Sequence, residues 1–181
     1  MFQGDRAARQ LVAVVLLDFI RRKVMSLDML RVIPIDPHYI PTRDVESRLR
    51  ELVENMLPDA GEIEIDFYNK MRFIDQGENF ERVICPECRS KLELHDEKIS
   101  DWWYTAVDVI DESDLPTHHI AMPCCNNEIA FIRLIFEWPA GFASFEIAIH
   151  DPNIARNLNE VELQRLGKVV GSPLTQVRAH Y

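Results

Sequence analysis

Four cysteines are the residues of this chain whose types and spacing most clearly predict chemistry. Cys85 and Cys88 frame the segment Cys-Pro-Glu-Cys, and Cys124 and Cys125 are adjacent further along. Two thiolates at Cys-x-x-Cys spacing can bind one Zn²⁺, and a second pair from a distant turn can complete a tetrahedron. The sequence therefore predicts a structural Zn²⁺ site with four sulfur ligands.

The adjacent pair is the less usual half of this site, because neighbouring side chains point apart unless the backbone turns. Pro123 before the pair and Asn126-Asn127 after it favour such a turn. In an alternative ligand set, one of the two cysteines is a buried thiol and His118 or His119 binds the metal instead. Two disulfides are a further alternative, but Cys-x-x-Cys spacing without a clear export signal favours reduced thiols in the cytoplasm.

Catalytic signatures give little support to an enzyme. A closed four-sulfur site leaves no position for water, and no glutamate lies in a His-x-Glu signature that would supply a base. The Gly-Lys pair at 167–168 is not part of a P-loop, and neither a dinucleotide fingerprint nor a Gly-x-Ser-x-Gly motif is present. No catalytic residue is predicted, and a small zinc hydrolase or deaminase using His118 or His119 stays an alternative.

The charge balance constrains the partner. The chain of 181 residues has a formal net charge of −10, which opposes phosphate contacts and disfavours a nucleic-acid-binding zinc ribbon. An acidic surface favours a basic protein partner. The prediction is a zinc-stabilised, non-enzymatic interaction module of the cytoplasm, for which an immunity or antitoxin-like role against a basic toxin fits the charge and size.

The pattern of apolar residues predicts an α+β fold with a mostly antiparallel sheet and three helices on one face. Helices are expected at 43–57, 97–110 and 160–170, the last with a capping pair at Asn159 and Glu162. A strongly apolar strand at 128–138 is expected to be central and to form a hairpin with 142–149. The other expected strands are 30–35, which ends at a sheet edge or leaves the sheet at its prolines, and 62–67, 71–74, 80–84, 90–95, 117–122 and 174–180.

Residues 29–181 are predicted to form a single domain with an embedded zinc knuckle made of 83–95 and 117–130. Residues 1–28 are an extension with an apolar helix at about 5–25, too short in its unbroken apolar run to cross a bilayer. Such a helix must be buried, lie on a membrane or pair with a copy of itself, which would give a homo-oligomer. No membrane partner is predicted, and Met25 and Met29 stay open as natural starts.

Several local motifs resemble one family. They are Arg-Val-Ile-Pro-Ile-Asp-Pro at 31–37, Phe-Glu-Arg-Val-Ile-Cys-Pro-Glu-Cys at 80–88, Met-Pro-Cys-Cys at 122–125 and Trp-Pro-Ala-Gly-Phe at 138–142. Over residues 29–181 the chain resembles small uncharacterised bacterial proteins with a zinc-ribbon-like knuckle, sometimes mislabelled as sugar-transporter ATPases. The resemblance implies a bacterial origin and the knuckle, and no activity. The family pattern has glycine after each cysteine pair, where this chain has Arg89 and Asn126.

Overall fold

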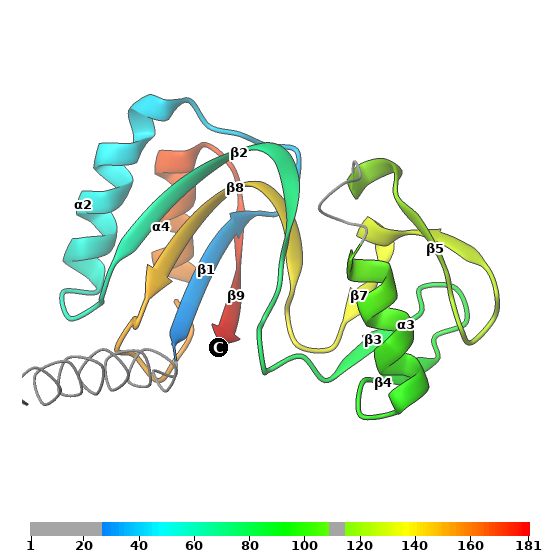
Figure 1. Ribbon diagram of the computed structural model, residues 1–181. Coiled ribbons are helices and arrows are strands. Elements are labelled where there is room, and N and C mark those ends of the chain that lie inside the picture. The colour runs from blue at the N-terminus through cyan, green and yellow to red at the C-terminus, as the bar shows by residue number, and fades with distance from the viewer. Residues whose placement is uncertain (1–26, 109–114) are drawn as a thin grey trace, which may run out of the picture.

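The computed structural model describes residues 27–108 and 115–181. The fold is α+β, with a sheet lobe and a second lobe inserted between two strands of that sheet (Figure 1). The helix expected at 5–25 lies outside the described residues, and so do positions 109–110 at the end of the helix expected from residue 97. The two lobes have separate hydrophobic cores.

The sheet lobe is built on four antiparallel strands in the order β2-β8-β1-β9. These are β1 (Asp28–Pro34), β2 (Ile63–Ile74), β8 (Gly141–His150) and β9 (Leu174–His180). Alternate residues of β8 enter the core, as its period-2 pattern predicts. At the end of the β1–β9 ladder, Leu27 and Tyr181 exchange two backbone hydrogen bonds of 2.8 and 3.0 Å.

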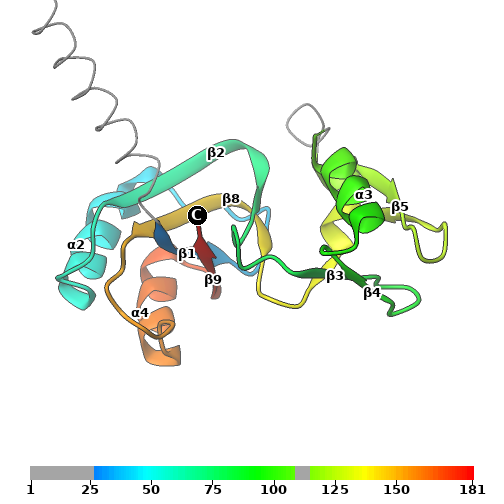
Figure 2. The same ribbon diagram turned by 60° about the horizontal axis from the view of Figure 1, so that its bottom comes forward.

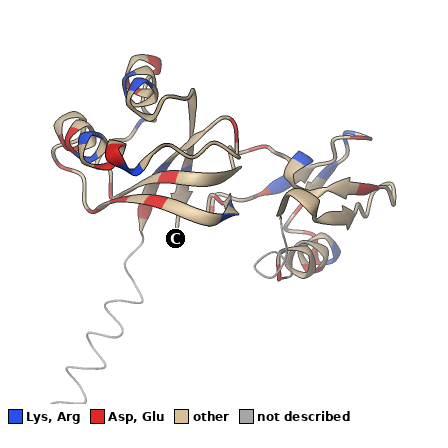
Figure 3. Cartoon of the chain, turned by 90° about the horizontal axis from the view of Figure 1, so that it is seen from above, with Lys and Arg blue, Asp and Glu red and all other residues tan. Residues whose placement is uncertain are grey.

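Helices α2 (Glu46–Met56) and α4 (Glu160–Val170) cover one face of this sheet (Figure 1). Their apolar sides join the strand residues in one core, while acidic and basic residues are interspersed on their outer sides (Figure 3). A short 3-10 turn, Arg43–Val45, precedes α2. The capping box predicted at Asn159 and Glu162 is confirmed, and Gly171 ends α4 at a φ of 87°.

The inserted lobe, named here the cysteine lobe, follows β2 and precedes β8 in the sequence, and it lies beside the sheet lobe (Figure 2). Its sheet has the order β4-β3-β7, with β3 at Arg82–Ile84, β4 at Lys91–Glu93 and β7 at Ile135–Phe136. A hairpin of β5 (His119–Ala121) and β6 (Glu128–Ala130) and the helix α3 (Glu97–Asp108) complete it. Two 3-10 turns, Leu115–Thr117 and Phe131–Arg133, connect these elements.

Aromatic side chains join the two lobes. Phe73 of β2 and Phe142 of β8 lie at the ends of the sheet strands, and both contact Phe131 of the cysteine lobe at ring distances of 5.9 and 5.7 Å. Phe73 also packs edge-on against Trp103 of α3. Aromatic pairs of this geometry stabilise beyond the area that they bury, so the lobes are packed against each other as well as linked by the chain.

The prediction of one continuous strand at 128–138 is wrong. The chain forms β6, then a 3-10 turn, then the short β7, which pairs with β3. The expected hairpin with 142–149 is therefore also wrong, since β8 pairs with β1 and β2. An unbroken apolar run has no period that distinguishes a strand from a buried turn, and here Phe131 and Leu134 are both buried in the cysteine lobe.

Two further differences concern the sheet lobe. The strands predicted at 62–67 and 71–74 are one strand, β2, with a register shift between Phe67 and Arg72. The first strand is an inner strand, although it does leave the sheet after Pro34. That proline lies beyond Val32, the last residue of β1 paired with β8, so its missing N–H removes no bond from that ladder.

Candidate metal centre

The two cysteine-containing turns share one backbone pattern. In the β3–β4 turn, Cys85 donates its N–H to the Ser90 carbonyl at 2.9 Å and accepts from the Arg89 N–H at 3.1 Å. In the β5–β6 turn, Met122 donates to Asn127 at 3.0 Å and accepts from Asn126 at 2.8 Å. The same two backbone hydrogen bonds therefore align residues 85–90 with residues 122–127, position by position.

The residue that follows each cysteine pair adopts the left-handed conformation. The φ of Arg89 is 63° and that of Asn126 is 56°. Glycine adopts this region at least cost and asparagine tolerates it, whereas arginine is strained there. The predicted family resemblance implies glycine at these two positions, and both residues adopt the turn that glycine would favour.

The four cysteine sulfurs meet between these turns. All four Sγ atoms lie within 4.8 Å of one another, with Cys88 and Cys124 3.4 Å apart and Cys85 and Cys125 3.9 Å apart. Tetrahedral Zn–S bonds of about 2.3 Å would place the sulfurs about 3.8 Å apart. All four cysteines are free, so the donor set fits a single metal ion rather than two disulfides.

The surroundings of the sulfurs differ across the site. Cys85 is fully buried in the core of the cysteine lobe, whereas Cys88 and Cys124 are exposed. The side chain and backbone of Ser90, hydrogen-bonded to the Cys88 sulfur, lower the pKa of Cys88 to about 6. Desolvation, followed by the hydrogen bond with Cys88, raises the pKa of Cys124 to about 12. A cation bound among the four sulfurs would favour ionisation of all of them.

Neither histidine considered as a substitute ligand belongs to this group. Within the residues that the structure describes, the metal-ligating cluster holds the four cysteines alone. The His118 ring lies 6.0 Å from that of Phe131, and its Nε2 is buried without a hydrogen-bond partner among the described residues. The Nδ1 of His119 is 2.8 Å from the Thr117 carbonyl.

A second group of ionisable residues lies on the sheet face that α2 and α4 leave uncovered. Glu146 of β8 is fully buried there and receives two hydrogen bonds from Arg31 and one of 2.8 Å from the Tyr68 hydroxyl. Arg31 also donates to the hydroxyl of Tyr181, which donates to Asp75. The sequence did not predict a role for Glu146, because the alternating apolar residues of β8 indicate only the core-facing side of the strand, and Glu146 lies on the other side.

No family model matches the chain, and comparisons with curated proteins and with solved structures find no match either. The family resemblance drawn from the motifs therefore stays a prediction. Over 27–108 and 115–181, none of the helices has the length and apolar character needed to cross a bilayer.

Proposed function

We propose that this chain is a non-enzymatic protein-interaction module of the cytoplasm, with a cysteine lobe stabilised by one structural Zn²⁺. The observation that carries the proposal is the mutual distance of the four sulfurs, all within 4.8 Å. Cys85, Cys88, Cys124 and Cys125 would be the ligands. Zinc is favoured over harder cations because a set of four thiolates is typical of structural zinc.

A structural role is favoured over catalysis by the nature of the donors. Four sulfurs close the coordination shell, and a hydrolase or deaminase would need an open position for water. The strands of the cysteine lobe are also only two or three residues long. A metal that joins the β3–β4 turn to the β5–β6 turn would supply the cross-link that such short ladders lack.

A protein partner is favoured by charge. A net charge of −10 disfavours nucleic acid and favours a basic protein, since contacts to phosphates need lysine and arginine. An immunity or antitoxin-like role is one function of this kind.

Two measurements on the purified protein test the proposal. Metal analysis is expected to find one zinc per chain, and X-ray absorption to find a shell of four sulfurs. Zinc-loaded protein is then expected to capture a host protein that, purified separately, forms a defined complex with it. A shell with nitrogen or oxygen, or zinc-dependent hydrolysis or deamination, would overturn the structural role.

Matched variants separate the site from its surroundings. Cys85→Ser with Cys88→Ser is expected to abolish zinc binding and complex formation. Glu87→Gln changes an exposed residue of the same turn that pairs with Arg133 and supplies no sulfur, and it should keep both. Complex formation by metal-free protein at full strength would contradict the proposed role of the metal.

A further inference from the structure

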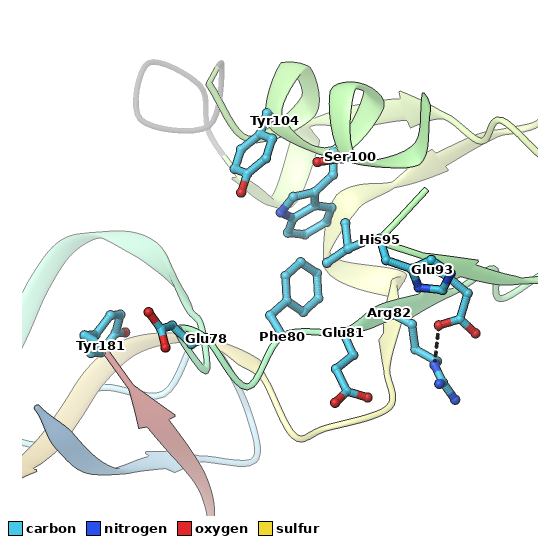
Figure 4. Close-up of a pocket in the computed structure, with 12 residues that line it drawn as sticks. Glu78, Phe80, Glu81, Arg82, Glu93, His95, Ser100, Tyr104 and Tyr181 are labelled. Carbon is cyan, nitrogen blue, oxygen red and sulfur yellow. Dashed lines mark hydrogen bonds and ion pairs between the residues drawn. The ribbon is translucent and has the colours of Figure 1, made fainter. Parts of the chain in front are cut away.

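A cleft of about 820 Å³ lies where the two lobes meet (Figure 4). The sheet lobe and the connection that leaves it contribute Gly77, Glu78 and Tyr181, and the cysteine lobe contributes the rest. This volume is within the range of ligand-binding clefts in proteins. The remaining lining residues are Phe80, Glu81, Arg82, Glu93, Leu94, His95, Ser100, Trp103 and Tyr104.

Aromatic rings line this cleft. Phe80 and Trp103 pack against each other at a ring distance of 4.6 Å. Tyr104 and Tyr181 are 63% and 42% exposed, which is unusual for large aromatic side chains. In Figure 4 they lie on different sides of the cleft, Tyr104 on α3 and Tyr181 beside Glu78. Exposed tyrosines that flank a cleft are typical anchors for a bound partner.

The charges in the cleft are mostly negative. The cleft is lined by three carboxylates, those of Glu78, Glu81 and Glu93, and by one guanidinium, that of Arg82. Arg82 is already paired with Glu93 at 3.0 Å and with Glu137 outside the cleft. Glu78 and Glu81 are exposed, and the structure gives neither an ion-pair partner among the described residues. Two carboxylates are thus available to a cation from outside.

The sheet side of the cleft is fixed in position. The backbone N–H of Glu78 donates to the His180 carbonyl at 2.7 Å. Gly77 approaches that same carbonyl so closely that a Cβ would lie 2.1 Å from it. The hydroxyl of Tyr181 bonds to Arg31 and Asp75. A preformed site of this kind loses less freedom when a ligand binds.

We infer that this cleft binds a basic segment of a partner protein, with an arginine or lysine side chain between the exposed tyrosines and the carboxylates of Glu78 and Glu81. The inference rests on the proposed interaction role and adds its binding surface. Cations are attracted to the faces of aromatic rings, and guanidinium groups also donate hydrogen bonds to carboxylates. The excess of negative charge is complementary to a basic segment and unfavourable for an acidic one.

A peptide titration tests the inference with the zinc-loaded full chain at 150 mM salt. The probe is an acetylated and amidated peptide of alternating glycine and arginine with four arginines. The control peptide carries citrulline in place of each arginine, which removes the charge and keeps the shape. The arginine peptide is expected to bind and the citrulline peptide to bind at least about tenfold more weakly, since it loses several charge-assisted bonds.

Protein variants locate the binding. Glu78→Gln with Glu81→Gln is expected to raise Kd at least about threefold. Glu51→Gln with Glu54→Gln removes the same charge from exposed positions on α2, and should leave Kd unchanged because salt screens distant charges. Tyr104→Leu is expected to raise Kd about two- to fivefold, while Tyr104→Phe keeps the ring and the affinity.

Specific outcomes would overturn the inference. Equal weakening by the α2 pair and the cleft pair would show non-specific attraction, and equal binding of the two peptides would exclude recognition of charge. Failure of the arginine peptide to bind would also overturn it, but would leave the four-sulfur shell and the captured complex unaffected. Absence of the four-sulfur shell and of the captured complex would instead overturn the proposed function. Failure of the cleft inference and failure of the proposed function therefore give different results.

Discussion

Met122 occupies in the β5–β6 turn the place that Cys85 occupies in the β3–β4 turn, with the same pair of backbone hydrogen bonds. By the same correspondence Cys125 matches Cys88, and Cys124 matches Glu87. A repeat of the first turn would place a metal ligand at position 122, where a buried methionine stands. The two adjacent cysteines are therefore not equivalent. Cys125 has a cysteine counterpart in the first turn, whereas Cys124, which supplies the fourth sulfur, has the counterpart Glu87.

Restoring the missing ligand is expected to rescue the site. Cys124→Ala should lower zinc affinity at least about tenfold, because it removes one of the four proposed ligands. Adding Met122→Cys to this variant should recover a four-sulfur shell, since the backbone already directs position 122 as it directs Cys85. Chelator competition gives the affinity, and the absorption of the Co²⁺-substituted protein reports the number of thiolates. A double variant no better than Cys124→Ala would contradict the correspondence of the two turns.

Removal of the metal is expected to unfold the cysteine lobe before the sheet lobe, because the two cores are separate. At zinc concentrations about 1,000 times Kd, binding contributes about 4 kcal/mol. Hydrogen exchange measured with and without chelator should show lost protection in β3–β6 and retained protection in β1 and β9. Loss of protection in both lobes at once would show that the sheet depends on the metal.

The ion pair between Arg31 and Glu146 is expected to be costly to break. Arg31→Ala leaves a fully buried carboxylate without its cation, which should cost about 3–5 kcal/mol in the free energy of unfolding. Arg156→Ala removes an arginine that is 53% exposed and pairs with Glu162, and should cost less than about 1 kcal/mol. Urea unfolding compares them, and similar costs would mean that the buried carboxylate finds another partner.

Asp66 is expected to make stability depend on pH. It lies opposite Glu146 in the β2–β8 ladder, and desolvation together with Glu64 and Glu146 raises its pKa. The folded state then holds the proton more tightly than the unfolded state, so ionisation destabilises the fold as pH rises above the ordinary value of about 3.9. Asp66→Asn should be more stable than the parent protein at neutral pH and lose this advantage below about pH 3.

Urea unfolding at both pH values measures the effect of Asp66, and Glu51→Gln on α2 controls for the loss of one exposed charge. An advantage of Asp66→Asn that is independent of pH would exclude ionisation as its cause.

Local patterns predicted much of this structure because they act over a few residues. The capping pair at Asn159 and Glu162 and the alternation along β8 identify their elements without knowledge of the rest of the chain. The spacing of Cys85 and Cys88 likewise predicts a turn that presents two sulfurs. The structure brings the four predicted sulfurs into one group.

Long-range features could not be read in this way. The inner position of β1 depends on pairing with β8 and β9, which are more than a hundred residues away. Glu146 can be buried because Arg31 on the neighbouring strand β1 pairs with its carboxylate. The cleft forms because the fold places Tyr181 beside the connection to the cysteine lobe. The equivalence of Met122 and Cys85 needed the hydrogen bonds, since their side chains differ.

The pairing of Leu27 with Tyr181 has a mechanical consequence. The two residues close one end of the antiparallel β1–β9 ladder, whose bonds run across the strands. A force that separates them loads these bonds one pair after another, as in opening a zipper, instead of shearing all of them together. The cysteine lobe is inserted between β2 and β8, outside this line of force, so tension between Leu27 and Tyr181 would peel β9 from the sheet before any load reached the four sulfurs.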